Sequence, residues 1–245
     1  MQRRNVLVGL AALGAGGCSR IGETRGFEAL VDGAMEWHRA AHRALAPGVS
    51  MAREYQVADL SPFFRGNGTT VIDTQRYRAH LARGFAQWQV TVGGLVARPL
   101  ALSMAQIRAL PQRTQITRHD CVEGWSAIGQ WTGPQLGPIL QFAGLRTEAR
   151  FIVFRCADVL YGGRYYESCD LDDAFHPQSI LAHALNGAPL LERNGAPLRL
   201  RIERQLGYKH AKYLTGIEAV ASLEGIEGGE GGFWEDRGYQ WYAGI

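Results

Sequence analysis

The stretch that decides the fold runs from Arg118 to Leu140 and reads RHDCVEGWSAIGQWTGPQLGPIL. Residues 114–117, just before it, alternate polar and apolar side chains, which is typical of a strand. Cys121 is therefore predicted to lie at or just past the end of that strand. Charged residues stand on both sides of its thiol, at 118–120 and at 123. Positive neighbours lower the pKa of a thiol and favour the thiolate, which is both a nucleophile and a soft metal ligand.

Glycine and tryptophan shape the rest of this stretch. Glycines at 124, 129 and 133 would let the backbone approach a bound group closely, and Trp125 and Trp131 could wall off a pocket. A buried cysteine in a Gly/Trp-rich loop is the plainer interpretation. The density of charged residues around the thiol favours a functional site instead.

Two motifs carry a family resemblance. Cys-Val-Glu-Gly-Trp-Ser (121–126), followed by Trp-x-Gly-x-x-Leu (131–136), resembles the molybdenum-binding segment of the sulfite oxidase superfamily, the oxidoreductase molybdopterin-binding domain. It is similar to the branch that contains the bacterial protein-methionine-sulfoxide reductase catalytic subunits. In that family the cysteine thiolate ligates molybdenum, so the resemblance assigns the metal-ligating and catalytic role to Cys121. Sulfite oxidases usually carry Gly-Asn-Arg-Arg soon after the cysteine, and the presence of Glu123 instead argues against sulfite.

Length and composition bound the other possibilities. A chain of 245 residues suits one large domain or two small ones. The formal charge of +3 argues against a nucleic-acid binder, and 31 glycines indicate a loop-rich protein rather than a helical bundle. Once the N-terminus is set aside, no stretch is long enough to span a membrane.

The N-terminus is predicted to be an export signal over residues 1–18. Arg3 and Arg4 precede an apolar run, 6–15, and resemble a twin-arginine signal, although an ordinary secretory signal stays open. Ala-Gly-Gly-Cys, ending at Cys18, resembles a lipobox and allows a lipid anchor there. A large cofactor inserted in the cytoplasm requires export of a folded protein. We therefore expect a periplasmic protein that touches the membrane only through this possible anchor.

Periodicity and capping residues predict the remaining organisation. We expect an N-terminal helical segment (19–58), a molybdopterin-binding catalytic domain (59–223), and a Gly-rich, aromatic C-terminal tail (224–245) that packs on the domain. The predicted elements are a helix over 27–46 closed by Pro47–Gly48, a strand over 88–92, a short helix over 103–110 capped by Ser103, a short helix over 135–143, a buried strand over 151–154, a mainly helical segment over 171–185, and a final strand over 217–223.

The resemblance also implies which residues hold the pterin. An Arg/Asn-bearing loop precedes the domain in this family, and Asn67, with Arg65 as a companion, matches it. Cys156 stands by position where a sulfoxide reductase threonine contacts the cofactor. By themselves, the glycines around Asn67 indicate no more than a tight turn.

A second signature lies nearer the C-terminus. Asn-Gly-Ala-Pro-x-Arg, followed by a strand and Gly-Tyr-Lys-x-x-Lys, matches the family's other pterin-binding motif. It assigns cofactor contacts to Asn194 and Arg199, with the guanidinium on a phosphate. His210, Ala211 and Lys212 would supply backbone amides and an ammonium to the same anion. Without the resemblance, these segments read as turns and a solvated surface.

The resemblance covers about residues 60–223 and implies an α+β fold, with a mixed sheet, short helices and long loops. The implied cofactor is molybdenum–molybdopterin in its mononucleotide form. We expect oxo transfer, with reduction of a sulfoxide or similar neutral oxide, small or protein-bound, by electrons from a membrane or periplasmic haem protein. Trp125, Tyr165, Tyr166 and Trp241 could line a mouth suited to such a substrate.

Three alternatives stay open. The chain could oxidise sulfite on the same fold, it could be a thiol-dependent enzyme using Cys121 with His119, or it could be a non-catalytic cofactor-binding lipoprotein. Metal analysis would separate the thiol enzyme from the others. Cys156 and Cys169 could pair as a disulfide in an exported protein, and we favour free, buried thiols.

Overall fold

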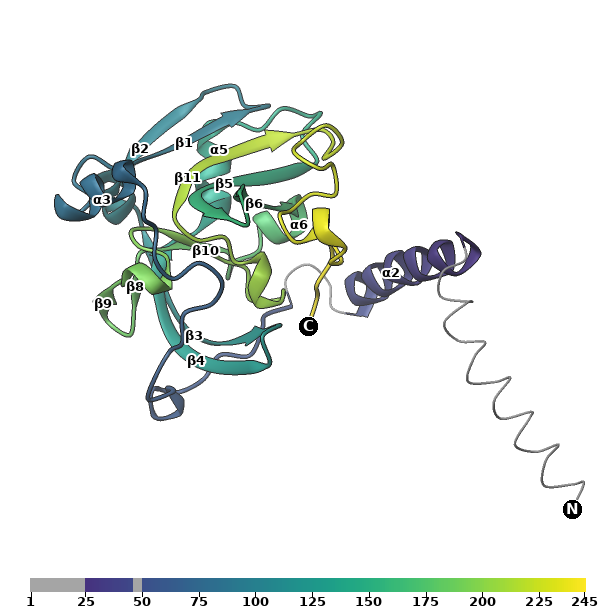
Figure 1. Cartoon of the computed structure of the whole chain (residues 1–245), viewed down its shortest axis with the longest axis horizontal. Helices are drawn as coiled ribbons and strands as arrows, with labels where there is room; N and C mark the ends of the chain where they lie inside the picture. The colour runs from purple at the N-terminus through teal and green to yellow at the C-terminus, as the bar shows by residue number, and fades with distance from the viewer. Residues whose placement is uncertain (1–24, 46–49) are drawn as a thin grey trace, which may run out of the picture. The chain divides into compact units, whose positions relative to one another are not determined.

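The computed structural model describes residues 25–45 and 50–245 (Figure 1). The expected export signal, Cys18 and the turn at Pro47–Gly48 lie outside these residues. The chain falls into two compact units that divide between positions 47 and 48. In the first, the helix α2 (Arg25–Leu45) confirms the amphipathic helix expected from residue 27. No helix in the described ranges is both long and apolar enough to cross a membrane.

A five-stranded sheet forms the larger part of the second unit. Its order is β2 (Leu100–Ser103), β1 (Gln89–Gly94), β11 (Leu214–Val220), β5 (Phe151–Leu160) and β6 (Gly163–Asp170). β1 and β11 run parallel, and the other neighbours pair antiparallel. The α+β class with a mixed sheet is therefore confirmed.

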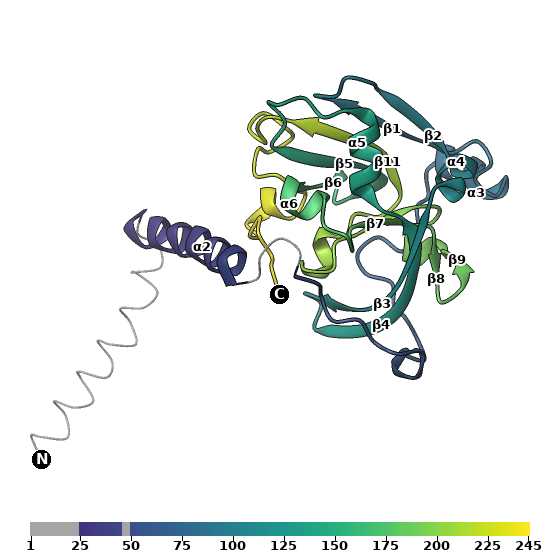
Figure 2. The ribbon, with the colours of Figure 1, turned by 180° about the vertical axis from the view of Figure 1, so that it is seen from behind.

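A long antiparallel ribbon forms the other part. β3 (Gln112–Cys121) pairs with β4 (Trp125–Pro134) along its whole length, and β8 (Ala184–Leu185) and β9 (Ala188–Pro189) extend this sheet. β7 (Ile180–Ala182) pairs with β10 (Arg199–Arg201). The ribbon lies below the five-stranded sheet in Figure 1, and Figure 2 shows the same separation from behind. Cys121, as predicted, is the last residue of its strand.

The loop that closes the ribbon depends on one glycine. Cys121 pairs with Trp125 across a three-residue loop, and the amide of Gly124 donates to the carbonyl of Cys121 (3.0 Å). Gly124 has φ +84°, a left-handed conformation that side chains disfavour. A Cβ there would meet nothing within 4 Å, so Gly124 serves backbone conformation, not close approach. At Gly133, a Cβ would collide with the backbone of Leu181, so close approach applies to that position.

The helices are short, as the sequence predicts. α4 (Met104–Ala109) begins with a capping box between Ser103 and Gln106, and α5 (Leu136–Ala143) follows Gln135. α3 (Gln75–Ala82) and α6 (Leu171–Ala174) complete the helices of this unit. Single 3-10 turns lie at Val57–Asp59 (η1), Glu192–Asn194 (η2), Gly207–Lys209 (η3) and Glu235–Arg237 (η4).

Four expectations need correction. The segment 171–185 is not mainly helical, because after α6 it becomes β7 and β8, which pair with distant strands. The strand expected over 151–154 continues to Leu160, and the final strand is 214–220. Residues 50–58 lie with the domain, since Glu54 bridges Thr117 and the Tyr55 amide donates to the Ile116 carbonyl (2.8 Å).

One hydrophobic core joins the sheets. Buried side chains from the five-stranded sheet, the ribbon and the β7–β10 pair belong to one cluster, which includes Phe154, Trp131 and Leu200. The tail returns to β6, where the Trp241 Nε1 donates to Ser168 Oγ (2.8 Å) and the Phe233 amide donates to the Tyr166 carbonyl (3.0 Å). Cys156 and Cys169 are free and buried, which confirms the favoured alternative.

Candidate active site

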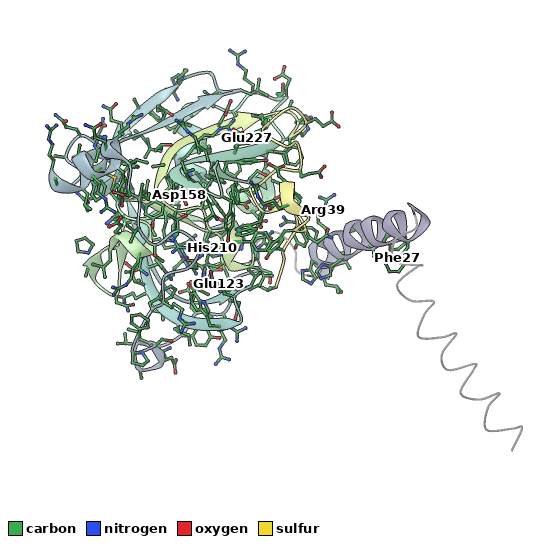
Figure 3. All side chains as sticks on the ribbon, viewed as in Figure 1. Phe27, Arg39, Glu123, Asp158, His210 and Glu227 are labelled. Atoms are coloured by element: carbon green, nitrogen blue, oxygen red, sulfur yellow. The ribbon has the colours of Figure 1, made fainter. Side chains whose placement is uncertain are left out.

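A cavity of about 470 Å³ opens beside Cys121. Figure 3 labels three of its lining residues, Glu123 from the β3–β4 loop, Asp158 from β5 and His210 after η3, between the ribbon and the five-stranded sheet. The cavity thus lies where the two sheets meet. Its lining residues are Asn67, Gly68, Thr69, Cys121, Val122, Glu123, Asp158, Leu160, Tyr161, Tyr165, Tyr208, His210, Lys212, Trp234 and Tyr239.

Cys121 is half-buried at the tip of the ribbon. Burial raises the pKa of its thiol, and the positive charges of Arg199 and Lys212 oppose that rise without cancelling it. The expectation of a lowered thiol pKa is therefore wrong for the protein alone. A metal ion would reverse this balance, because a coordinating thiol is deprotonated.

Glu123 ties the ribbon tip to the Asn67 loop. Its carboxylate accepts hydrogen bonds from the Gly68 amide (3.0 Å) and from Trp125 Nε1 (3.0 Å). Burial acts to raise the pKa of Glu123, and these two hydrogen bonds outweigh it, so the net pKa is lowered. The cavity wall next to Cys121 therefore carries a negative charge at neutral pH.

Lys212 binds the same loop from the other side. Its ammonium donates to the carbonyls of Asn67, Thr69 and Arg193. Burial and the charge of Arg199 lower the pKa of Lys212 to about 7. Asp158 faces the same cavity, and burial raises its pKa to about 6.

Arg199 lies under this region, fully buried. Its guanidinium lies over the ring of Trp131 (5.0 Å) and donates to the carbonyls of Asn194 (3.2 Å) and His210 (3.3 Å). Burial and Arg201 lower the pKa of Arg199 to about 9. Arg199 thus joins Asn194 and His210, and the second predicted signature forms one cluster over residues 194–212.

Four predicted cofactor residues present unused polar atoms. Within residues 25–45 and 50–245, Asn67 Oδ1, Asn194 Nδ2, Arg199 Nε and His210 Nδ1 are buried and have no hydrogen-bond partner. Buried polar groups are normally paired, because leaving one unpaired costs about 1–3 kcal/mol. Asn67 and His210 line the cavity, and Arg199 donates to the carbonyls of Asn194 and His210, so the four lie in one region that fits a polar, anionic ligand.

The structure does not bring every predicted residue to the cavity. Asn194 and Arg199 are buried and absent from its lining. Arg65 is exposed and also absent from it, and Cys156 lines a second cavity of about 300 Å³. Ala211 is buried, and its carbonyl accepts from the Leu200 amide (2.8 Å). Of the aromatic residues expected at the mouth, Tyr165 lines the cavity, whereas Trp125, Tyr166 and Trp241 do not.

His119 does not serve as a base for Cys121. It is buried, its Nδ1 accepts a hydrogen bond from Arg201 (2.8 Å), and its ring packs against Gly207. Burial, Arg201 and His210 hold its pKa well below the usual value. His119 is absent from the cavity lining, which removes the geometric support for a thiol-dependent enzyme.

Sequence reasoning missed several lining residues. Asp158 and Tyr161 were given no role, and Tyr208 was included only as part of the second signature. Trp234 and Tyr239 were expected only to pack on the domain. The aromatic density of the tail was the available signal for the last two. The other three depend on the β5–β6 turn and on η3, which periodicity does not place.

The sequence profile of the oxidoreductase molybdopterin binding domain matches residues 78–224. This chain belongs to that family. The match contains Cys121 and the whole 194–212 cluster, so the family supplies an occupant for the unpartnered groups. Its members bind molybdenum through molybdopterin, and the donor set around Cys121 fits that cofactor.

Relatives and one solved structure agree with this assignment. A putative protein-methionine-sulfoxide reductase subunit of Azospira oryzae is 40% identical over 159 residues, which are 65% of this chain and 56% of the relative. A protein-methionine-sulfoxide reductase catalytic subunit of Xanthomonas axonopodis is 34% identical over 147 residues, 56% of this chain and 46% of the relative. The chain spans about half the length of these two relatives.

The fold resemblance comes from the sulfane dehydrogenase SoxCD of Paracoccus pantotrophus. Its TM-score is 0.52 at 19% identity, over 56% of this chain and 39% of that chain. The sulfite-oxidase-type fold is therefore confirmed. Among the described residues, no group of three or more His, Cys, Asp and Glu side chains could hold a bare metal ion.

Proposed function

We propose that this protein is a molybdenum enzyme that reduces a neutral oxide, with a sulfoxide as the leading substrate. The reaction consumes two electrons and two protons and releases the sulfide and water. The observation that supports this substrate class most directly is the ionised carboxylate of Glu123 beside Cys121. A fixed negative charge repels sulfite and leaves a neutral oxide unaffected.

The cation of the described lining, Lys212, already donates its ammonium to the carbonyls of Asn67, Thr69 and Arg193, so it is little available to a small anion. No arginine is found among the described residues that line the cavity, and the buried Arg199 and Arg201 are absent from that lining. Sulfite would need such groups, because small oxyanions are bound best by guanidinium donors. The aromatic residues of the lining offer an apolar surface instead.

When bound, molybdenum–molybdopterin supplies the two-electron oxo-transfer chemistry. Cys121 would ligate the metal from the ribbon tip, and Asn67, Asn194 and His210 would satisfy their unpartnered atoms on the pterin. We propose that the cofactor is the mononucleotide form of molybdopterin. Its single phosphate would suit Arg199 and Lys212, which both belong to the 194–212 cluster. The carboxyl of Asp158, with its pKa raised to about 6, can hold a proton inside the cavity.

The partner and location are part of the proposal. Electrons would come singly from a membrane or periplasmic haem protein, and the export signal expected over residues 1–18 would place the enzyme in the periplasm. The substrate would be a small or a protein-bound oxide. The names of the relatives from Azospira and Xanthomonas support a sulfoxide.

Steady-state assays of the molybdenum-loaded protein test this function. Methionine sulfoxide with a reduced dye donor should be turned over, and sulfite with an oxidised acceptor should not. Cys121→Ser is the matched control, which should lose turnover and change the molybdenum absorption while the circular dichroism spectrum stays the same. Rapid sulfite oxidation without turnover of any S-oxide or N-oxide would refute the proposal.

A further inference from the structure

Two residues of the C-terminal tail line the Cys121 cavity although they lie beyond the family match, which ends at 224. The rings of Trp234 and Tyr239 stack with centroids 5.1 Å apart and planes 27° apart. Tyr208 meets Tyr239 edge-on at 5.3 Å, and Tyr161 meets Trp234 at 6.1 Å. We call these four residues the aromatic wall. It is one continuous apolar surface on the cavity.

The wall is held by charges beneath it. Glu235, next to Trp234, is buried and pairs with Lys209, whose ammonium also lies 2.6 Å from Glu167. Lys209 directly follows Tyr208 in η3. The same buried ammonium therefore fixes the tail side of the wall and the η3 side relative to each other.

Hydrogen bonds from tyrosine hydroxyls add to this anchor. Tyr208 Oη donates to the Gln240 carbonyl (2.6 Å), and Tyr165 Oη donates to the Tyr208 carbonyl (2.7 Å). On β6, Tyr166 Oη donates to Asp236 (2.6 Å). An aromatic surface fixed in this way is preorganised, so a ligand that binds to it orders few side chains.

We propose that Trp234 and Tyr239 are specificity-determining residues, which bind the organic part of the oxide while its oxygen faces the Cys121 side of the cavity. This inference rests on the proposed function. The lining divides by chemistry, with Glu123, Asp158 and Lys212 as the charged groups and the aromatic wall as the apolar one. Aromatic faces attract alkyl groups and polarisable sulfur, and their negative quadrupole favours a neutral ligand over an anion.

The test compares a large and a small sulfoxide. In Trp234→Ala and Tyr239→Ala, kcat/KM for methionine sulfoxide should fall about tenfold, as expected for one lost aromatic contact. The value for dimethyl sulfoxide, which offers little organic surface, should change less than about threefold, because it loses little of this contact. Trp241→Phe is the matched control, because Trp241 belongs to the same tail but does not line the cavity. It should leave the ratio of the two substrates unchanged.

A binding measurement separates this inference from the proposed function. Methionine sulfone is an analogue with the same organic part, and calorimetry should show weaker binding in the two alanine variants at unchanged molybdenum content. If the wild-type protein reduces no oxide, the proposed function fails, and the sulfone titration still tests the wall. Equal substrate ratios in wild-type and variant proteins, or equal sulfone affinities, would overturn the inference.

Discussion

Arg199 shows how a single residue can be placed for a ligand rather than for the fold. It is a fully buried cation. Burial and the positive charge of Arg201 both lower its pKa. Its hydrogen bonds go to two backbone carbonyls, and its Nε has no partner among the described residues. A buried charge in this setting destabilises the protein unless an anion joins it.

Arg199→Met is therefore expected to separate stability from cofactor binding. Methionine keeps an apolar stem over Trp131 and removes the charge, so the melting temperature of the cofactor-free protein should hold or rise. Cofactor affinity should fall by a factor that corresponds to about 1.5–3 kcal/mol, measured as molybdenum and pterin content. Arg193→Ala, an exposed arginine over Phe63, is the control. Full cofactor content in Arg199→Met would contradict the phosphate assignment.

Lys212 predicts a pH dependence of the cofactor-free protein. Its pKa is lowered from 10.5 to about 7, so between these values the unfolded chain binds more protons than the folded one. Stability should therefore rise as pH increases from about 7 towards 10, and be lost as pH falls back through 7. Urea unfolding at several pH values measures this. The rise should vanish in Lys212→Met and shrink in the loaded protein, whose anion keeps the ammonium charged.

The conformation of the ribbon tip at Gly124 is expected to matter for cofactor binding. Gly124→Ala puts a side chain at φ +84° in open space, so the cost is backbone strain of about 1 kcal/mol. Gly187→Ala, between β8 and β9 at φ +77°, has the same kind of cost and is the control. Both variants should lose similar stability in urea, while only Gly124→Ala lowers molybdenum content. Equal molybdenum content in the two would mean that the tip conformation does not matter to the site.

Local chemistry explains which elements were predictable. Ser103 with Gln106 is a capping box that forms within four residues, so its signal is local. The strand before Cys121 was predicted correctly, although Gln115, Ile116 and Thr117 are all buried and do not alternate. Residues 171–185 behaved differently, because β7 and β8 obtain their hydrogen bonds from β10 and β4, far away in sequence. Tertiary pairing overrides local helical tendency there.

The residues of the site also divide into those that a local motif predicted and those that depend on distant strand pairing. Cys121, Asn194 and Arg199 were found through motifs, and the structure brings them to one region. Asp158 was missed because the pairing of β5 and β6 shifts register between Arg155 and Val159, which redirects the side chains that follow. A bulge of this kind has no signature in one sequence, and the family resemblance pointed by position to Cys156 instead.

At the scale of the whole molecule, the Lys209 cluster joins β6, η3 and the tail. Lys209→Met would leave the carboxylates of Glu167 and Glu235 buried without their cation. Burial and Glu235 already raise the pKa of Glu167. Loss of the ammonium should cost about 3–5 kcal/mol in unfolding free energy, since it breaks a buried ion pair from one side. Limited proteolysis should then cut within residues 224–245.

Glu235→Gln is the comparison for that variant. It leaves Lys209 paired with Glu167, so a smaller loss of stability is expected, again measured in urea. If Lys209→Met unfolded at the wild-type urea concentration and its tail resisted protease, the cluster would not be what holds the tail in place.

The position of β11 has a consequence for biosynthesis. The ribosome makes a protein from its N-terminus to its C-terminus. The central strand of the five-stranded sheet, β11, is therefore the last of the five to be made. Until residues 214–220 leave the exit tunnel, β1 and β5 each have an unpaired edge that another nascent chain could join. The sheet can be completed only after residues 214–220 have been made, so a chaperone that covers these two edges would have to act until then.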